Sequence, residues 1–108
     1  MAVLSIDSGS QLTVIDTEHT LATETGAGVY VLVVDTNVLA NGDQLIIRMK
    51  TKAKSGSTSR LVYEATFFNV QGELNKYSPA IPIDTELICT IEQTDGSVRT
   101  FDWNLLKL

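Results

Sequence analysis

The chain has 108 residues and a formal net charge of −5, and 44% of its residues are hydrophobic. That length suits one domain over residues 1–108 and leaves no room for two comfortable ones. The negative charge argues against nucleic-acid binding, because such proteins carry a basic surface that displaces counterions from phosphates. The one cysteine, Cys89, has no partner for an internal disulfide, which favours assembly inside a cell.

Neither secretion nor membrane insertion is expected. The first residues lack a basic segment followed by a long apolar one, so no signal peptide is predicted. The longest apolar run covers residues 29–34, whereas a membrane helix needs roughly 20 apolar residues. We therefore expect a soluble protein without a membrane partner.

The residue pattern favours strands along the whole chain. Val and Thr are plentiful, and their branched side chains fit a pleated surface. The expected strands cover residues 11–15, 20–23, 29–34, 44–52, 60–70, 86–92 and 98–106. Together they predict an all-β fold, an antiparallel β-sandwich of jelly-roll-like or immunoglobulin-like type with little or no helix.

Glycine, serine and proline mark the connections between these strands. Residues 8–10 predict the first turn, and the loop 55–59 predicts a hairpin between its flanking strands. Asp95-Gly96 predicts a second hairpin. Residues 71–84 contain both prolines of the chain, which predicts an extended loop that crosses between the sheets.

The segment 44–52 alternates with a period of two. Leu45, Ile47 and Met49 share one face and predict a buried side. The intervening basic residues share the opposite face. This pattern is typical of a half-buried antiparallel strand.

No motif in the chain indicates an enzyme, a cofactor or a metal site. The single histidine, His19, is interpreted as a surface residue because a general base needs a positioned partner. Cys89 alternates with apolar neighbours and is interpreted as a small buried hydrophobe. One histidine and one cysteine cannot build a usual zinc site. The pairs Glu18 with Glu24 and Glu64 with Glu92 are commonplace on a β scaffold and are not assigned as a glycosidase pair.

The candidate partner-binding site is a basic strip in the middle of the chain, formed by Arg48, Lys50, Lys52, Lys54 and Arg60. One interpretation is a solvated outer sheet face whose lysines discourage edge-to-edge pairing. The other is docking onto an acidic partner, since complementary charge sets register and speeds encounter. Nucleic acid ranks third, because no aromatic residues interleave with the basic ones.

The chain also carries more apolar residues than one small core face requires. Residues 30–34 and Phe67-Phe68 place apolar groups on both faces of their strands, and 105–108 end the chain with little polarity. Exposed apolar surface marks interfaces, and symmetric self-association is the common outcome. We expect a homo-oligomer.

Five segments together resemble a family of small proteins encoded among the virion structural genes of tailed bacteriophages: residues 28–43, 47–52, 72–79, 89–94 and 101–103. The resemblance covers nearly the whole chain after about Glu18. It implies a capsid cement or decoration protein, a non-enzymatic virion protein that binds the major capsid protein as a dimer or trimer and stabilises the shell. Such a protein is made in the host cytoplasm. The resemblance assigns a role to no individual residue.

Two alternatives remain open. One is a phage tail or head-tail connector protein, which would also be rich in strands. The other is a small carbohydrate-binding module, in which Trp103, Tyr30, Tyr63 or Tyr77 would form an exposed stacking platform. Because Trp103 alternates in phase with Phe101, we expect it in the core, which disfavours the module.

Overall fold

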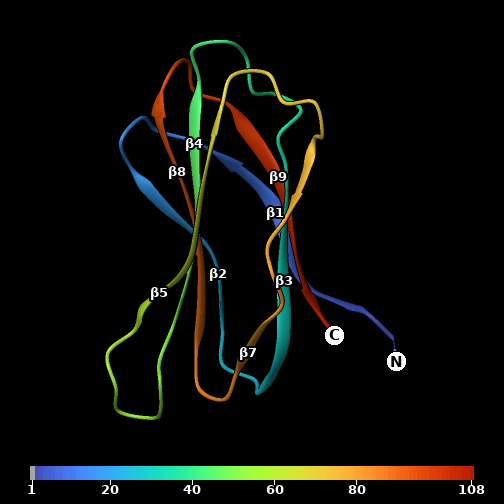
Figure 1. Ribbon diagram of the computed structural model, residues 1–108, viewed down its shortest axis with the longest axis vertical. Coiled ribbons are helices and arrows are strands. Elements are labelled where there is room, and N and C mark those ends of the chain that lie inside the picture. The colour runs from blue at the N-terminus through green and yellow to red at the C-terminus, as the bar shows by residue number, and fades with distance from the viewer. Residues whose placement is uncertain (1) are drawn as a thin grey trace.

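The computed structural model describes residues 2–108 and contains nine strands and no helix within that range. The strands are β1 (Leu4–Leu12), β2 (Glu18–Glu24), β3 (Gly28–Asp35), β4 (Gln44–Thr51), β5 (Arg60–Phe68), β6 (Asn75–Tyr77), β7 (Ile81–Ile83), β8 (Leu87–Asp95) and β9 (Thr100–Lys107). They form two antiparallel sheets that pack together as a sandwich (Figure 1). The predicted all-β sandwich is confirmed.

The order of the strands identifies the sandwich as a jelly roll. Sheet A has the order β1-β9-β3-β6, with β7 also paired to β3, and sheet B has the order β2-β8-β4-β5. The first strand thus pairs with the last, the second with the next to last, and β4 with β5 at the centre of the nesting. This nested pairing is the jelly-roll arrangement. In an immunoglobulin sandwich the first two strands share a sheet, whereas β1 and β2 lie in different sheets here.

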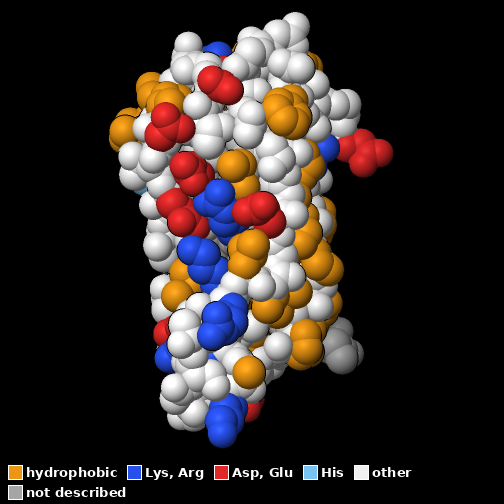
Figure 2. Space-filling view, turned by 60° about the vertical axis from the view of Figure 1, so that its left-hand side comes forward, with side chains coloured by type: hydrophobic (Ala, Val, Ile, Leu, Met, Phe, Trp, Pro, Cys, Tyr) orange, Lys and Arg blue, Asp and Glu red, His pale blue; other side chains and the backbone are white. Residues whose placement is uncertain are grey.

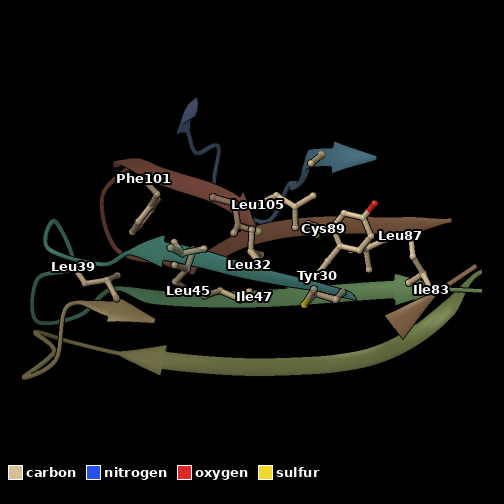
Figure 3. Packing of buried hydrophobic residues seen from close by; sticks show 14 residues of the cluster. Tyr30, Leu32, Leu39, Leu45, Ile47, Ile83, Leu87, Cys89, Phe101 and Leu105 are labelled. Carbon is tan, nitrogen blue, oxygen red and sulfur yellow. The ribbon is translucent and has the colours of Figure 1, made fainter. Parts of the chain in front are cut away.

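The core lies between the two sheets and is built by alternate residues of the central strands. In β4, Leu45, Ile47 and Met49 are fully buried as predicted, and β3 contributes Tyr30 and Leu32. Figure 3 shows these side chains from the two sheets filling the space between them. The other core residues are Ala22, Val34, Leu39, Ile83, Leu87, Cys89, Ile91, Phe101 and Leu105.

A buried carboxylate ties the loops at one end of the sandwich. Asp43 accepts hydrogen bonds from the N–H of Ala40 at 2.9 Å and of Ser97 at 3.3 Å. It also accepts one from Arg99 Nε at 2.9 Å. Burial by itself raises the pKa of Asp43, but these hydrogen bonds outweigh it and the net pKa is lowered. The carboxylate therefore stays charged and holds the β3–β4 and β8–β9 connections together.

Two predicted connections are wrong, and a third is confirmed in part. Residues 8–10 form no turn, because β1 runs through them and pairs with β9, and a turn follows at 15–16 instead. Asp95-Gly96 closes no hairpin, because β8 belongs to sheet B and β9 to sheet A. The stretch 71–84 crosses between the sheets as predicted, from β5 in sheet B to sheet A and back to β8, but it is not only a loop: it contains two short strands, β6 and β7, which line the edge of sheet A beside β3. The predicted hairpin around 55–59 is confirmed as the β4–β5 pair.

Candidate functional site

The outer face of sheet B carries an ion network centred on Arg48, which is one of the predicted partner-binding residues. Its Nε donates to Glu64 Oε2 at 2.7 Å, and its Nη1 donates to Glu92 Oε1 at 2.8 Å. Its Nη1 also lies 3.5 Å from Glu18 Oε2, and Lys50 Nζ lies 3.0 Å from the same oxygen. Arg48 thus connects its own strand, β4, to β2, β5 and β8, the three other strands of the sheet.

Hydrogen bonds within this network shift the pKa values of Arg48 and Glu18 in the directions that keep both groups ionised. Hydrogen bonds to Glu92 and Glu64 raise the pKa of Arg48 above its already high value. A hydrogen bond from Thr90 Oγ1 at 2.6 Å lowers the pKa of Glu18, against the opposing effect of burial, and Lys50 and Arg48 lower it further. The positive charges of Arg48 and Lys50 are therefore neutralised by carboxylates of the same chain, and little of that charge remains to attract a partner.

The remaining three residues of the predicted strip lie beyond this network. Among residues 2–108, no carboxylate forms an ion pair with Lys52, Lys54 or Arg60. Figure 2 shows Lys and Arg side chains running down this face to the end where the β4–β5 loop lies, with most of the Asp and Glu side chains in the upper part. The uncompensated positive charge is therefore concentrated at one end of sheet B.

Lys52 and Arg60 border a cleft of about 500 Å³ at the base of the β4–β5 loop, which we call the basic cleft. Its lining residues are Thr51, Lys52, Ala53, Gly56, Ser57, Thr58, Arg60 and Val62. A volume of this size falls within the range of small-ligand pockets. Two cations, three hydroxyls and a few aliphatic groups suit a carboxylate or another small anion.

The loop that walls the basic cleft is shaped by one tight turn. The N–H of Ser57 donates to the carbonyl of Lys54 at 3.0 Å, and Gly56 has a φ of 85°. A positive φ at the third residue of such a turn is the requirement of a type II turn and favours glycine. The type II turn at 54–57 therefore sets the shape of the loop that walls the basic cleft.

A second, shallower cleft of about 180 Å³ lies on sheet A. It is lined by Val33, Asp35, Asn75, Asp102, Trp103 and Asn104. Tyr77, which is 64% exposed, pairs with Val33 in the register of β6 and β3. We call this the sheet A cleft. Carboxylates, amides and a nearby exposed aromatic ring are the groups with which proteins hold polyhydroxylated ligands.

The aromatic residues considered for a stacking platform do not lie together on one surface. Tyr30 is buried, and its hydroxyl donates to the carbonyl of Gly26 at 2.6 Å. Trp103 and Tyr63 are half-buried and pack against the core. The prediction that Trp103 belongs to the core is thus confirmed in part, and Tyr77 alone of the four is largely exposed.

The contacts of His19 and the burial of Cys89 indicate structural roles for both residues. His19 Nε2 accepts a hydrogen bond from the N–H of Val14 at 3.0 Å, and its Nδ1 lies 3.3 Å from Gln11 Nε2, so the ring braces the β1–β2 turn. It is half-buried rather than on the surface. Burial raises the pKa of the Cys89 thiol to about 12. Residues 2–108 contain no group of three or more His, Cys, Asp or Glu placed to hold a metal ion.

The described residues also contain no helix that is long and apolar enough to span a membrane. Comparisons with protein-family models, curated proteins and solved structures give no match to this chain. The basic cleft, the sheet A cleft and the exposed strand edges are the candidate binding features of this chain.

Proposed function

We propose that this chain is a non-enzymatic virion structural protein that binds the surface of a phage capsid and stabilises the shell. One observation carries the proposal. On a chain with a net charge of −5, the cations Lys52, Lys54 and Arg60 gather at one end of sheet B without an internal carboxylate partner. Such a local charge fits an acidic partner surface, because complementary charge speeds encounter and fixes orientation.

The fold and the resemblance to phage virion proteins support the same role. Jelly rolls are frequent among capsid and lectin domains, although a fold alone does not determine a function. The antiparallel sandwich gives a rigid body whose loops project at its ends, as a protein clamped onto a lattice requires (Figure 1). A protein that binds only the assembled shell stabilises it by mass action.

The proposal includes self-association into a dimer or trimer. Large apolar side chains are exposed on β1, an edge strand of sheet A: Leu4, Ile6 and Leu12. Apolar side chains that remain in water in the free chain favour contact with another copy. Light scattering during size-exclusion chromatography would give the mass, and a strictly monomeric protein at high concentration would contradict this part.

The capsid proposal is tested by adding the purified protein to empty phage shells and measuring the bound protein after sedimentation. Saturable binding at a fixed ratio to the capsid subunits, with greater resistance of the shells to heat, is the expected result. The variant Lys52→Gln with Arg60→Gln should bind at least about tenfold more weakly and with less dependence on salt. Absence of saturable binding to any shell would overturn the proposal.

A matched control separates the basic cleft from net charge. The variant Ser8→Glu with Thr100→Glu makes the same total change in charge on exposed residues of β1 and β9, in the other sheet. It should bind shells nearly as well as the unchanged protein. If both variants lose affinity equally, net charge rather than the basic cleft controls binding.

The sheet A cleft supports a second candidate function, the binding of a carbohydrate. Asp35, Asn75, Asp102 and Asn104 line it, and the ring of Tyr77 is free to stack on a sugar. A glycan array would test this directly. Hits that disappear in Tyr77→Ala would support sugar binding, and an array without hits would remove it.

A further inference from the structure

We propose that the partner contributes an extended acidic peptide segment, which adds as a strand to the open edge of β5 and places a carboxylate in the basic cleft. This inference rests on the proposed capsid-binding role and names the chemistry of the contact. It combines two features that lie next to each other, since Arg60 both begins β5 and lines the basic cleft.

The first feature is an unpaired strand edge. In sheet B, β5 is the last strand and pairs with β4 alone in the described residues. The backbone N–H and C=O groups on its other side are therefore available to an added strand. At the far end, Gln71 Nε2 donates to the carbonyl of Phe68 at 2.6 Å, so the edge is already closed there. The open stretch is the part of β5 that lies nearer the basic cleft.

The second feature is the anion-binding character of the basic cleft. Lys52 and Arg60 border it without carboxylate partners, and apart from the strand ladder the loop has one backbone hydrogen bond, from Ser57 to Lys54. A carboxylate bound there would gain charge-assisted hydrogen bonds from groups that lack partners in the free protein.

The side chains along the first part of β5 indicate what surrounds that carboxylate. Leu61 and Val62 are 49% and 46% exposed, which is unusual for aliphatic residues in a strand that offers a free edge. An added strand with aliphatic residues next to its acidic one would cover them. The basic cleft also includes Val62 and Ala53, which fit the methylene stem of a glutamate.

Charge favours a peptide over a nucleic acid at this edge. Beyond the basic cleft, β5 offers no further cation, because its next charged residue is Glu64, which is paired with Arg48, so a continuous chain of phosphates would find no positive charge there. No aromatic residue lines the basic cleft to stack a base. A peptide with one or two carboxylates matches a short positive region followed by an aliphatic edge.

Hydrogen exchange measured by mass spectrometry, on the full chain free and bound to empty shells, tests the inference. New protection should fall on the amides of 60–67 and of the loop 52–58, while those of β1 should change little. Binding to shells with protection elsewhere would overturn this inference and leave the capsid proposal standing. Protection of 60–67 that arises from self-association without shells would show that a second copy occupies the edge, and would also overturn it.

A peptide experiment tests the chemistry separately. Overlapping short peptides that cover the major capsid protein are titrated against the chain while the backbone amide signals are followed by NMR. Peptides that bind should contain Glu or Asp beside aliphatic residues and should shift signals of β5. Replacing their acidic residues by amides, or using Lys52→Gln with Arg60→Gln, should weaken binding at least about tenfold. Equal binding of the amide peptides would overturn the inference even if the chain binds shells.

Discussion

Arg48 Nε donates to Glu64 Oε2 at 2.7 Å across the β4–β5 pair, on the same strand pair whose loop forms the basic cleft. The guanidinium simultaneously reaches Glu92 on β8. This arrangement fixes the register of three neighbouring strands at the centre of sheet B. It also divides the predicted basic strip into a structural half and a half available to a partner.

Arg48→Met should lower the free energy of unfolding by about 1–3 kcal/mol. The loss is expected because Glu18, Glu64 and Glu92 would face one another without their common cation, and the Arg48 side chain is only 19% exposed. Urea unfolding followed by fluorescence would measure it. Lys54→Met is the control and should stay within about 0.5 kcal/mol, since its side chain is exposed and makes no ion pair with residues 2–108. Equal losses in the two variants would contradict a structural role for the network.

Stability should fall at acid pH through Asp43. Its pKa is lowered from the ordinary value of 3.8, so the folded state binds the proton less tightly than the unfolded chain does. Its contribution to stability is therefore complete above the unfolded pKa and is lost as the pH falls through the folded pKa. Glu18, whose pKa is also lowered, acts in the same direction. Asp43→Asn should be less stable near neutrality and should lose less stability between about pH 4 and pH 2. Unfolding curves over this range that run parallel to those of the unchanged protein would contradict the prediction.

Gly96→Ala should be much more disruptive than Gly42→Ala. Both glycines have a positive φ, 94° and 96°, so each alanine has a similar backbone cost of about 1 kcal/mol. At Gly96 the new Cβ would overlap the carboxylate of Asp43 and lie 2.8 Å from its Cα, whereas at Gly42 no atom lies within 4 Å. Thermal unfolding should show a clearly larger fall in Tm for Gly96→Ala. Similar Tm values for the two variants would contradict the prediction, because they would mean that Asp43 can move away from the new Cβ without loss of stability.

Cys89 should not react with a thiol reagent in the folded protein. Its side chain is buried in β8, and burial raises the pKa of the thiol to about 12, so almost no thiolate exists at neutral pH. A colorimetric thiol assay should detect one thiol per chain in strong denaturant and almost none without it. Rapid labelling of the native protein would show that the sandwich opens often around β8.

Sequence patterns predicted those elements whose signal is local. The alternation of Leu45, Ile47 and Met49 needs no partner strand to be read, and the loop 55–59 joins strands that are neighbours in the chain. The choice between a jelly roll and an immunoglobulin sandwich depends on which distant strands pair. No local pattern reports the pairing of β1 with β9.

The sequence predicts a turn at 8–10 where β1 runs, because the small residues there are required by packing against a distant strand and not by a turn. Serine and glycine at 8–10 are typical of a turn, yet Gly9 lies beside the indole of Trp103, where an added Cβ would approach Nε1 to 3.3 Å. The glycine leaves room for a large ring on the neighbouring strand. That requirement is visible only when β1 and β9 are placed side by side.

The sequence predicts the basic strip as one group, but it does not show that Arg48 and Lys50 are paired with carboxylates while Lys52, Lys54 and Arg60 form no ion pair among residues 2–108. The carboxylates that neutralise Arg48 and Lys50 come from Glu18, Glu64 and Glu92, which lie on three other strands. Spacing within 48–60 contains no information about them. The residues next to the loop keep their charge uncompensated, because among residues 2–108 no carboxylate forms an ion pair with Lys52, Lys54 or Arg60.

The nested pairing of strands also has a consequence for how the chain folds. Ser5 Oγ donates to Asn104 Oδ1 across 99 positions, and β1 contacts the rest of sheet A only through β9. During synthesis, β1 must therefore remain without its neighbour until β9 has left the ribosome. Folding is then expected on the slow millisecond-to-second scale of proteins dominated by distant contacts. A truncation that removes β9 would leave β1 unpaired and β3 paired only with the short strands β6 and β7, and such a chain should remain open to chaperones and proteases.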